Sequence, residues 1–236
     1  MMKVIITGAS KGIGSGIAAV LARKGYHVGL TARSQDLLKQ MQDQIASDGG
    51  RCHIAACDLR DPDQVQAAFS KLIEQMNGVD ALINNAGLVI RKDVFTLSLD
   101  EWRAMVETNI NGVFYAVRVV LPFMKRQGGG HIINISSISG RLPLPGGSGY
   151  AATKYAVTGF SESLMQEVRD YGIKVTTIFP GSVDSESHRH DPDENHSWKI
   201  KPEEVGVACH EVLNTAPGAL ISQLEIRPLH RPPQKK

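Results

Sequence analysis

The chain has 236 residues, of which 42% are hydrophobic and 21% charged, and 26 basic side chains stand against 24 acidic ones. These fractions are typical of a globular protein with one sizeable core, and they exclude collagen-like, disordered and low-complexity chains. A formal net charge of +2, with no long run of Lys or Arg, excludes an electrostatic footprint for nucleic acid.

The sequence also gives only weak signals for a membrane segment or for cysteines in disulfide or metal-binding patterns. The longest wholly apolar stretch is Ile17–Ala22, far short of the roughly 20 residues that span a bilayer. The first residues run directly into a strand-like segment without a signal-peptide pattern. The cysteines, Cys52, Cys57 and Cys209, are odd in number and lack CxxC spacing. We therefore expect a cytoplasmic, single-domain protein with reduced thiols, no membrane segment and no nucleic-acid partner.

Short β-branched segments alternate with longer helical patterns, which is typical of repeated βαβ units and a parallel sheet. The expected strands cover residues 3–7, 27–32, 51–57, 79–84, 131–136, 174–179 and 220–226. The expected helices cover residues 13–24, 35–46, 62–77, 99–126, 150–171 and 201–214. The expected fold class is therefore α/β. It is a Rossmann-type, doubly wound sheet of about seven mostly parallel strands, with helices on both faces and its site at the carboxyl edge.

A glycine-rich segment, TGASKGIG at 7–14, lies between the first expected strand and the first expected helix. Glycines allow a tight turn and close approach of a phosphate, and the helix N-terminus behind them offers N–H groups and partial positive charge. The GxxxGxG spacing differs from GxGxxG and lacks the GK[ST] ending of a P-loop, which disfavours nucleotide triphosphate chemistry. Its position in a βαβ unit favours a dinucleotide cofactor over a simple helix start.

The residues after the second expected strand indicate which dinucleotide binds. An acidic residue there bonds the ribose 2′-hydroxyl of NAD, whereas the 2′-phosphate of NADP needs positive charge. The chain has Ala32 and Arg33 at this place and no acid, and Lys11 in the glycine turn is a second cation. We therefore expect NADP(H).

Tyr150 and Lys154 are four residues apart in a helical segment, so their side chains share one face. A tyrosine of pKa near 10 is a poor acid–base catalyst at neutral pH, and a neighbouring ammonium group would stabilise the phenolate and lower that pKa. Ser136 and Ser137 end a strand upstream, where a serine hydroxyl could hold a carbonyl oxygen beside the tyrosine. A YxxxK pair alone is common on protein surfaces, so the assignment depends on the surrounding motifs.

Together these motifs resemble the short-chain dehydrogenase/reductase family, in its compact branch, over essentially the whole chain. The members it most resembles are 3-oxoacyl-ACP reductases and carbonyl reductases. The matching features, in chain order, are TGASKGIG at 7–14, Asp58 of CDL, NNAG at 84–87, Asn109, Ser137, YAATK at 150–154 and PG at 180–181.

The resemblance implies catalytic roles for four residues. Tyr150 would protonate the carbonyl oxygen as hydride reaches its carbon, and Lys154 would lower the pKa of the tyrosine and hold the nicotinamide ribose. Ser137 would orient and polarise the substrate carbonyl. Asn109 would hold a water that relays protons towards Lys154.

The resemblance also implies a cofactor site. The residues expected to contact NADP(H) are Gly8, Ser10, Lys11, Gly12, Ile13, Gly14, Arg33, Asp58, Leu59, Asn85, Ala86, Gly87, Tyr150, Lys154, Pro180, Gly181, Val183 and Ser185. Among them, Asp58 and Leu59 would contact the adenine and Val183 would bond the nicotinamide carboxamide. Ser185 stands where the family often has threonine. Asn84, beside this set, would join neighbouring strands.

Two segments lie outside the alternating pattern. Within a single catalytic domain of residues 1–228, residues 184–200 are expected to form a short, polar substrate lid, and residues 229–236 a flexible basic tail. Residues 186–198 of this lid lack apolar anchors and are expected to be mobile. The lid histidines, His188, His190 and His196, match no standard zinc spacing, so we expect no metal. A short polar lid suggests an open site and disfavours a buried apolar substrate such as a steroid.

The expected function is NADP(H)-dependent interconversion of a carbonyl and an alcohol, with a small ketone or aldehyde, a 3-oxoacyl thioester or a 3-hydroxy acid as substrate. The alternative is a catalytically silent NADP(H)-binding sensor or scaffold, against which the intact Ser137, Tyr150 and Lys154 argue. Relatives pair through the helices that correspond to residues 99–126 and 150–171. We therefore expect a homodimer or homotetramer.

Overall fold

The structure is a computed structural model that describes residues 1–142, 145–185 and 196–230. Its strands form one sheet in the order β3-β2-β1-β4-β5-β6-β7, and each neighbouring pair is parallel. The strands are β1 (Lys3–Thr7), β2 (His27–Ala32), β3 (Arg51–Ala56), β4 (Ala81–Asn84), β5 (Gly130–Ile135), β6 (Ile173–Pro180) and β7 (Gln223–Ile226). The expected fold class, a doubly wound parallel sheet in one domain, is confirmed.

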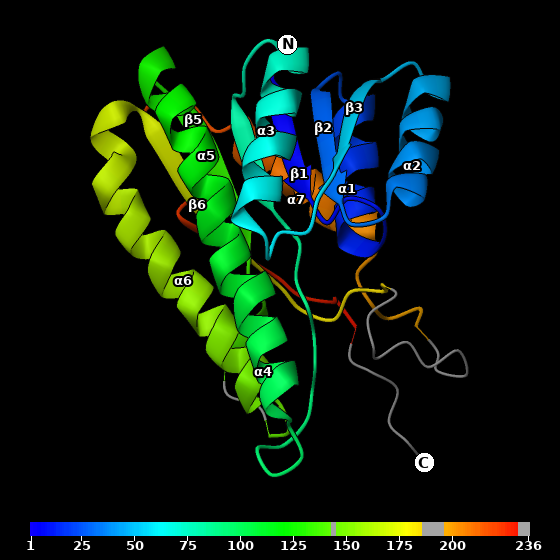
Figure 1. The fold of residues 1–236 in the computed structure, drawn as a ribbon, viewed down its shortest axis with the longest axis vertical. Helices are drawn as coiled ribbons and strands as arrows, with labels where there is room; N and C mark the ends of the chain where they lie inside the picture. The colour runs from blue at the N-terminus through cyan, green and yellow to red at the C-terminus, as the bar shows by residue number, and fades with distance from the viewer. Residues whose placement is uncertain (143–144, 186–195, 231–236) are drawn as a thin grey trace.

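Helices cover both faces of the sheet (Figure 1). They are α1 (Gly12–Arg23), α2 (Gln35–Ser47), α3 (Pro62–Met76), α4 (Leu99–Val106), α5 (Gly112–Gln127), α6 (Ser148–Val168) and α7 (Pro202–Leu213), with short helices η1 (Glu107–Asn111), η2 (Ile138–Gly140) and η3 (Arg169–Tyr171). The apolar residues of α3, α5 and α6 pack on one face of the sheet, and those of α1, α2 and α7 on the other. Among the described residues, no helix is both long and apolar enough to cross a membrane.

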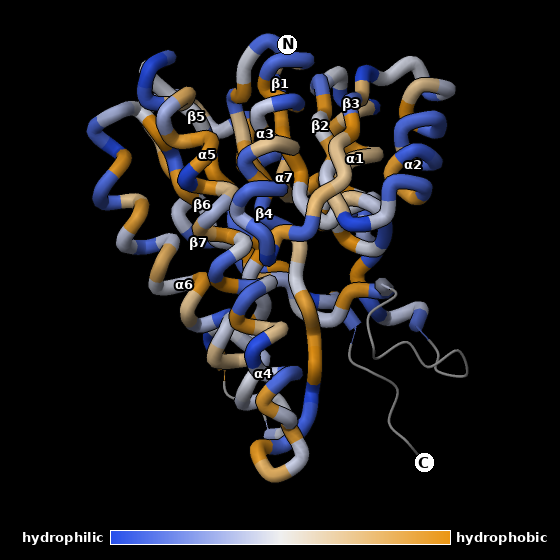
Figure 2. Tube along the Cα trace, viewed as in Figure 1, coloured by the Kyte–Doolittle hydropathy of each residue, from blue (hydrophilic) through white to orange (hydrophobic). Residues whose placement is uncertain are grey.

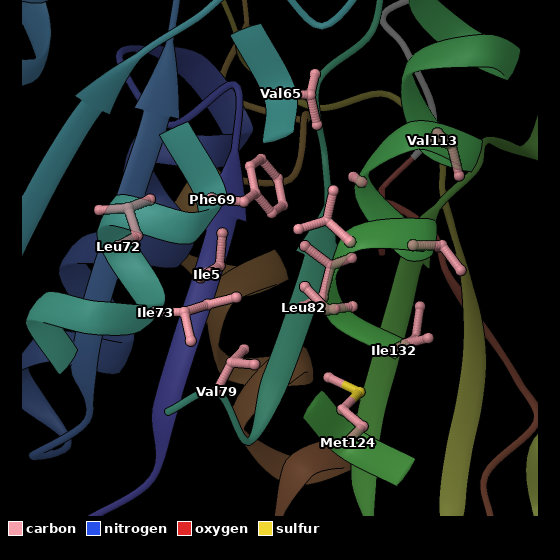
Figure 3. Close-up of a cluster of buried hydrophobic side chains, with 14 of the residues drawn as sticks. Ile5, Val65, Phe69, Leu72, Ile73, Val79, Leu82, Val113, Met124 and Ile132 are labelled. Carbon is pink, nitrogen blue, oxygen red and sulfur yellow. The ribbon is translucent and has the colours of Figure 1, made fainter. Parts of the chain in front are cut away.

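Strand alternation divides the core into these two layers. Within β1, Ile5 belongs to the cluster under α3 and α5, whereas Val4 and Ile6 belong to the cluster under α1 and α7. All three side chains are fully buried, as expected for a parallel strand covered on both faces. Figure 3 shows the first cluster, in which Phe69 of α3 points towards the strands that carry Ile5 and Leu82. Figure 2 shows hydrophobic segments inside the sheet and mixed hydropathy along the outer helices.

Several element boundaries differ from the sequence expectation. The helix expected over residues 99–126 is interrupted by the π-helical turn η1, which the 3.6-residue pattern does not reveal. The last strand begins at Gln223 rather than at residue 220, and the hydroxyl of Thr176 donates to the carbonyl of Ile221 just before it. Helix α6 begins two residues before Tyr150, so the tyrosine lies within its first turn.

The carboxyl ends of the strands share one edge of the sheet, and α4 together with the adjoining parts of α5 and α6 extends beyond that edge (Figure 1). The chain order reverses between β1 and β4, which are neighbours in the sheet. In open α/β sheets, ligands bind in the crevice outside the carboxyl ends at such a switch point. The fold therefore places the candidate site beyond the ends of β1 and β4.

Phe69→Ala tests the packing of the first cluster. Phe69 is fully buried, so its truncation should lower the free energy of unfolding by about 3–5 kcal/mol through lost transfer energy and a residual cavity. Urea unfolding followed by circular dichroism measures this change. Gln66→Ala, on the exposed face of the same helix, should stay within about 0.5 kcal/mol of the unaltered protein. Equal stability of the Phe69 variant and the unaltered protein would contradict this packing.

Candidate active site

The glycine turn after β1 is held against the loop after β4 by two side chains. The Thr7 hydroxyl accepts hydrogen bonds from the backbone N–H groups of Asn85 and Ala86, both at 3.0 Å. In return, the Asn85 side-chain amide donates to the carbonyl oxygens of Thr7 and Gly8, at 3.0 and 3.2 Å. The two loops that flank the switch point therefore form one hydrogen-bonded unit.

Within this unit the glycines leave no room for side chains. A Cβ atom on Gly14 would lie 2.2 Å from the carbonyl oxygen of Gly8, and one on Gly8 would lie 2.7 Å from the Cα of Ala86. Gly8 and Gly12 also have positive φ angles of 63° and 58°, which favour glycine. The turn is consequently as close to the β4 loop as backbone atoms allow.

The N-terminus of α1 has the features of an anion site. Its cap residue, Lys11, is extended and makes no side-chain capping bond, and the first turn contains no acidic residue. Ser10 and Ile13 are half-buried beside the turn, and Ser185, from the segment after β6, approaches Gly12. Uncapped N–H groups and a positive helix end are what a pyrophosphate requires. These residues therefore fit a dinucleotide.

The ends of β2 and β3 carry the charged residues of the site. Arg33 is exposed directly after β2, where the chain has no acid. Asp58, after β3, forms a bidentate ion pair with Arg60 at 2.5–3.0 Å, and its hydrogen bonds with Arg60 hold the pKa of the Asp58 carboxyl below its usual range. The Leu59 side chain is buried against Gly112 of α5, so the side chain lies in the core rather than at the edge.

Asn109 fixes the loop that follows β4. It lies in η1 and is 1% exposed. Its side-chain oxygen accepts from the N–H of Leu88 at 2.7 Å, and its amide donates to the carbonyl of Leu88 and to the hydroxyl of Thr153, both at 2.9 Å. The Thr153 hydroxyl in turn donates to the carbonyl of Tyr150. Asn109 thus joins the β4 loop to the first turns of α6.

Lys154 is 5% exposed, and its ammonium donates to the carbonyl of Ile135 at 2.8 Å. Burial lowers the pKa of this lysine to about 8. Its nitrogen lies 5.9 Å from the centre of the Tyr150 ring. A Cβ atom on Gly87 would lie 3.6 Å from the Lys154 nitrogen and 3.5 Å from the side-chain oxygen of Asn109, so glycine keeps a small cradle open between these groups.

The end of β5 is packed tightly onto α6. A Cβ atom on Gly140 would lie 2.6 Å from the hydroxyl oxygen of Ser136 and 2.8 Å from the carbonyl of Lys154. Ser137, at the start of η2, accepts from the N–H of Ser139 at 3.1 Å and retains its own O–H as a donor. Ser137 is 8% exposed and Tyr150 6%. This arrangement can hold a carbonyl oxygen with hydroxyl donors and stabilise a phenolate with an ammonium group.

The segment after β6 is closed by a short parallel bridge between Val183 and Ile200. The N–H of Asp184 donates to Ile200, and the N–H of Ile200 donates to Ser182. Pro180 pairs with the last residue of β7, and Gly181 donates to that same residue, Ile226, at 2.7 Å. These contacts fix the path of the chain between β6 and α7 at both ends.

The structure describes only part of the expected lid. Residues 186–195, with His188 and His190, lie outside the described residues. Within residues 196–200, Ile200 is buried and Trp198 half-buried, so apolar side chains hold this end of the segment against the protein. The ring of His196 bonds the carboxylate of Asp184 at 3.1 Å.

The predicted site residues share one edge of the sheet because the ends of six strands, β1 to β6, supply most of them and helices supply the rest. Sequence reasoning missed the roles of Thr7 and Thr153, although both lie inside motifs that it singled out. It also missed Arg91, whose guanidinium carbon lies 5.4 Å from the centre of the Tyr150 ring. For Arg91 the sequence holds no signal, because the path of the loop after β4 depends on its bonds to Asn109.

Comparisons with known proteins agree with this geometry. The family model of the short chain dehydrogenases matches residues 2–196. An uncharacterized oxidoreductase of Staphylococcus saprophyticus is 36% identical to this chain over 235 residues, which covers 95% of each protein.

Solved structures are similar over nearly the whole chain. An alcohol dehydrogenase of the archaeon Thermococcus sibiricus, in complex with 5-hydroxy-NADP, superimposes with a TM-score of 0.92 at 30% identity and covers 100% of both chains. The closed form of a serine dehydrogenase complexed with NADP+ has a TM-score of 0.87 at 31% identity, and covers 95% of this chain and 94% of its own.

The buried ammonium of Lys154 predicts a pH dependence of stability. Its pKa is about 8 in the folded protein and about 10.4 in an unfolded chain. Between these values the unfolded chain binds a proton that the folded protein has lost, so the free energy of unfolding should rise with pH by about 3 kcal/mol. Lys154→Met should abolish that rise. Urea unfolding of the cofactor-free proteins at pH 7.5 and pH 10.5 measures it.

Lys92→Met is the matched control, since it removes an exposed lysine and should keep the pH dependence of the unaltered protein. A Lys154 variant with an unchanged rise would show that the Lys154 ammonium is not desolvated.

Proposed function

The chain belongs to the short-chain dehydrogenase family, and from that premise we propose that it is an NADP(H)-dependent oxidoreductase that interconverts a carbonyl and an alcohol. The observation that carries the proposal is the pairing of Tyr150 with the buried ammonium of Lys154 at the carboxyl edge of the sheet. A buried cation one helical turn from a phenol is costly for stability, and acid–base chemistry gives it a use.

The residues of the glycine turn would hold the cofactor. The uncapped start of α1 suits the pyrophosphate, and Arg33 and Lys11 suit the 2′-phosphate of NADP. The cradle at Gly87, between Asn109 and Lys154, would take the nicotinamide ribose. A bound NADP(H) supplies or accepts the hydride. The NADP complexes of similar structures support this cofactor choice.

The side chains of the chain itself would move the proton. In the reducing direction the Tyr150 hydroxyl gives its proton to the carbonyl oxygen of the substrate, and the Lys154 ammonium stabilises the phenolate that results. The Ser137 O–H donates to the same substrate oxygen and strengthens that bond as charge develops. In the oxidising direction each of these transfers runs backwards, with Tyr150 as the base.

In this scheme the main role of Asn109 is to hold Leu88 and Thr153 in place beside the reacting groups. Its amide donates hydrogen bonds to the carbonyl of Leu88 and to the hydroxyl of Thr153, so both N–H groups are occupied. Its oxygen faces the cradle at Gly87. That oxygen accepts one bond from Leu88 and has a second lone pair, which can hold a water beside Lys154. The proton relay that the sequence suggests therefore stays part of the proposal.

The substrate is a small molecule or an acyl thioester that carries a carbonyl or hydroxyl group. Similar solved structures are named as an alcohol dehydrogenase and a serine dehydrogenase, and both names are consistent with this substrate class.

We also propose assembly into a homodimer or homotetramer through α4, α5 and α6. Exposed apolar side chains on these helices, Trp102, Phe114 and Tyr155, support that assembly.

Tyr150→Phe tests the proton transfer. The variant keeps the ring and its packing but removes the hydroxyl, so kcat should fall by about 10²–10⁴-fold or more while NADPH still binds. Turnover is measured by NADPH oxidation with the substrate found in a panel of ketones, aldehydes and 3-oxoacyl thioesters.

Tyr155→Phe is the matched control, because it removes a hydroxyl from an exposed tyrosine of the same helix. It should keep near-normal turnover. Near-normal turnover of the Tyr150 variant would refute the proposed chemistry, and no turnover by the unaltered protein with tight NADPH binding would favour the sensor.

Ala32→Asp combined with Arg33→Ala tests the cofactor preference. Loss of one charge-assisted contact to the 2′-phosphate should weaken NADPH binding by about ten- to a hundredfold, and the new acid should favour NADH. The measurement is kcat/KM for both cofactors. Arg51→Ala, an exposed arginine at the amino end of β3, should leave the preference unchanged. Equal kcat/KM for NADPH and NADH in the unaltered protein would contradict the assignment.

A further inference from the structure

The ends of β2 and β3 bring an arginine and an aspartate to the same place at the edge of the sheet. The two strands are parallel neighbours (Figure 1), with Ala32 opposite Ala56, and the N–H of Cys57 continues the pairing by donating to the carbonyl of Ala32 at 3.0 Å. Arg33 and Asp58 follow directly. In the proposed cofactor site this edge receives the adenosine ribose, so both charges act on the 2′-phosphate of NADP.

The carboxylate of Asp58 is bound by Arg60, two residues further along the chain. The Arg60 Nε atom lies 3.0 Å from each carboxylate oxygen, and its Nη2 atom lies 2.5 Å from Oδ2. The backbone N–H of Arg60 adds a fourth bond, to Oδ1 at 3.0 Å. Within the part of the chain that the structure describes, Arg60 supplies every hydrogen bond to this carboxylate.

The segment between β3 and α3 is held by further hydrogen bonds that do not involve Arg60. The side-chain oxygen of Gln64 accepts from the N–H of Asp58 at 3.1 Å, and its amide donates to the carboxylate of Asp61 at 2.8 Å. The Asp61 carboxylate also caps α3 by accepting from the N–H groups of Asp63 and Gln64. Loss of the arginine would therefore leave Asp58 at the same edge, with its charge no longer neutralised.

Arg33 has different surroundings. It is exposed and makes no hydrogen bond or ion pair with another residue that the structure describes. Its charge nevertheless reaches Asp58, because hydrogen bonds with Arg60 lower the pKa of the Asp58 carboxyl most and the charge of Arg33 lowers it further. Of two guanidinium groups near one carboxylate, the one with bidentate geometry is the stronger partner. Arg60 thus keeps Asp58 from pairing with Arg33.

From these contacts, and resting on the proposed use of NADP(H), we infer that Arg60 is a positioning residue for cofactor choice that acts through Asp58. It neutralises a carboxylate that would otherwise repel the 2′-phosphate and compete with it for Arg33. Arg33 is left to bind the phosphate. NAD(H) has no 2′-phosphate, so its binding does not depend on Arg60 in this way.

NADP+ and NAD+ differ only in the 2′-phosphate, so they test this role without turnover. Each is titrated by calorimetry into each protein, and the ratio of the two dissociation constants gives the preference for NADP+. A changed contact to the adenine cancels in this ratio. Arg60→Gln should reduce the preference by about three- to tenfold at low ionic strength, as expected for partly exposed charges. The reduction should shrink in about 0.5 M salt, which screens such charges.

The double variant Arg60→Gln with Asp58→Asn separates neutralisation from other roles of Arg60. Without the carboxylate there is nothing left to neutralise, so the double variant should recover the preference of the unaltered protein to within about twofold. A persistent loss would mean that Arg60 contacts the phosphate itself or acts on Glu107, whose charge also lies near it. Either result would overturn the inference.

Arg103→Gln is the matched control, since it removes an exposed arginine paired with Asp100 in α4 and should leave the preference unchanged. An unchanged preference in Arg60→Gln would overturn the inference and leave the cofactor assignment standing. Loss in Arg60→Gln with recovery in the double variant, but no turnover of any substrate, would support the inference and count against the proposed reaction alone. Equal binding of NADP+ and NAD+ by the unaltered protein would overturn both the inference and the cofactor assignment.

Discussion

The reciprocal bonds between Thr7 and Asn85 are the contact on which the site depends. They join the ends of β1 and β4, the neighbouring strands between which the chain order reverses. A parallel sheet brings strand ends to a common edge, but it does not fix the loops beyond them. The backbone of Gly8 can approach Ala86 closely because Gly8 has no side chain, since a Cβ atom there would lie 2.7 Å from the Cα of Ala86. From this junction one loop leads to the glycine turn, and the other leads past Gly87 to Asn109.

Local sequence patterns are sufficient to predict those site residues whose positions are set by their neighbours in the chain. The glycines of 7–14 and the pair Tyr150 and Lys154 belong to this class, because turn geometry and the helical repeat decide their placement. Arg91 and Thr153 belong to another class. Their positions depend on contacts 48 and 44 residues away in the chain, and periodicity carries no information about such contacts. Ile200 escaped prediction for the same reason, since its anchor is Val183 across the segment after β6.

Burial of Lys154 sets stability against reactivity. A desolvated ammonium with one backbone acceptor weakens the fold below its shifted pKa, yet that same desolvation makes its field strong at Tyr150. The surrounding elements offset the cost by rigid packing, with Gly140 pressed against the carbonyl of Lys154 and Ser136 bonded to it. The charge of Lys154 therefore lowers the stability of the fold and serves the proposed chemistry at the same time.

The π-helical turn η1 changes the rotational phase of a long helix. In a regular α-helix each residue advances by about 100°, so one additional residue in a turn rotates everything that follows by that amount. Before the turn, Met105 of α4 faces Gly149 at the start of α6, and after it Gly112 of α5 faces Leu59 in the core. The helical segment from α4 to α5 therefore packs against the start of α6 before the turn and against Leu59 in the core after it. Asn109 lies in this turn, so deletion of Glu107 or Thr108 would rotate its amide away from Leu88 although Asn109 itself stayed in the chain.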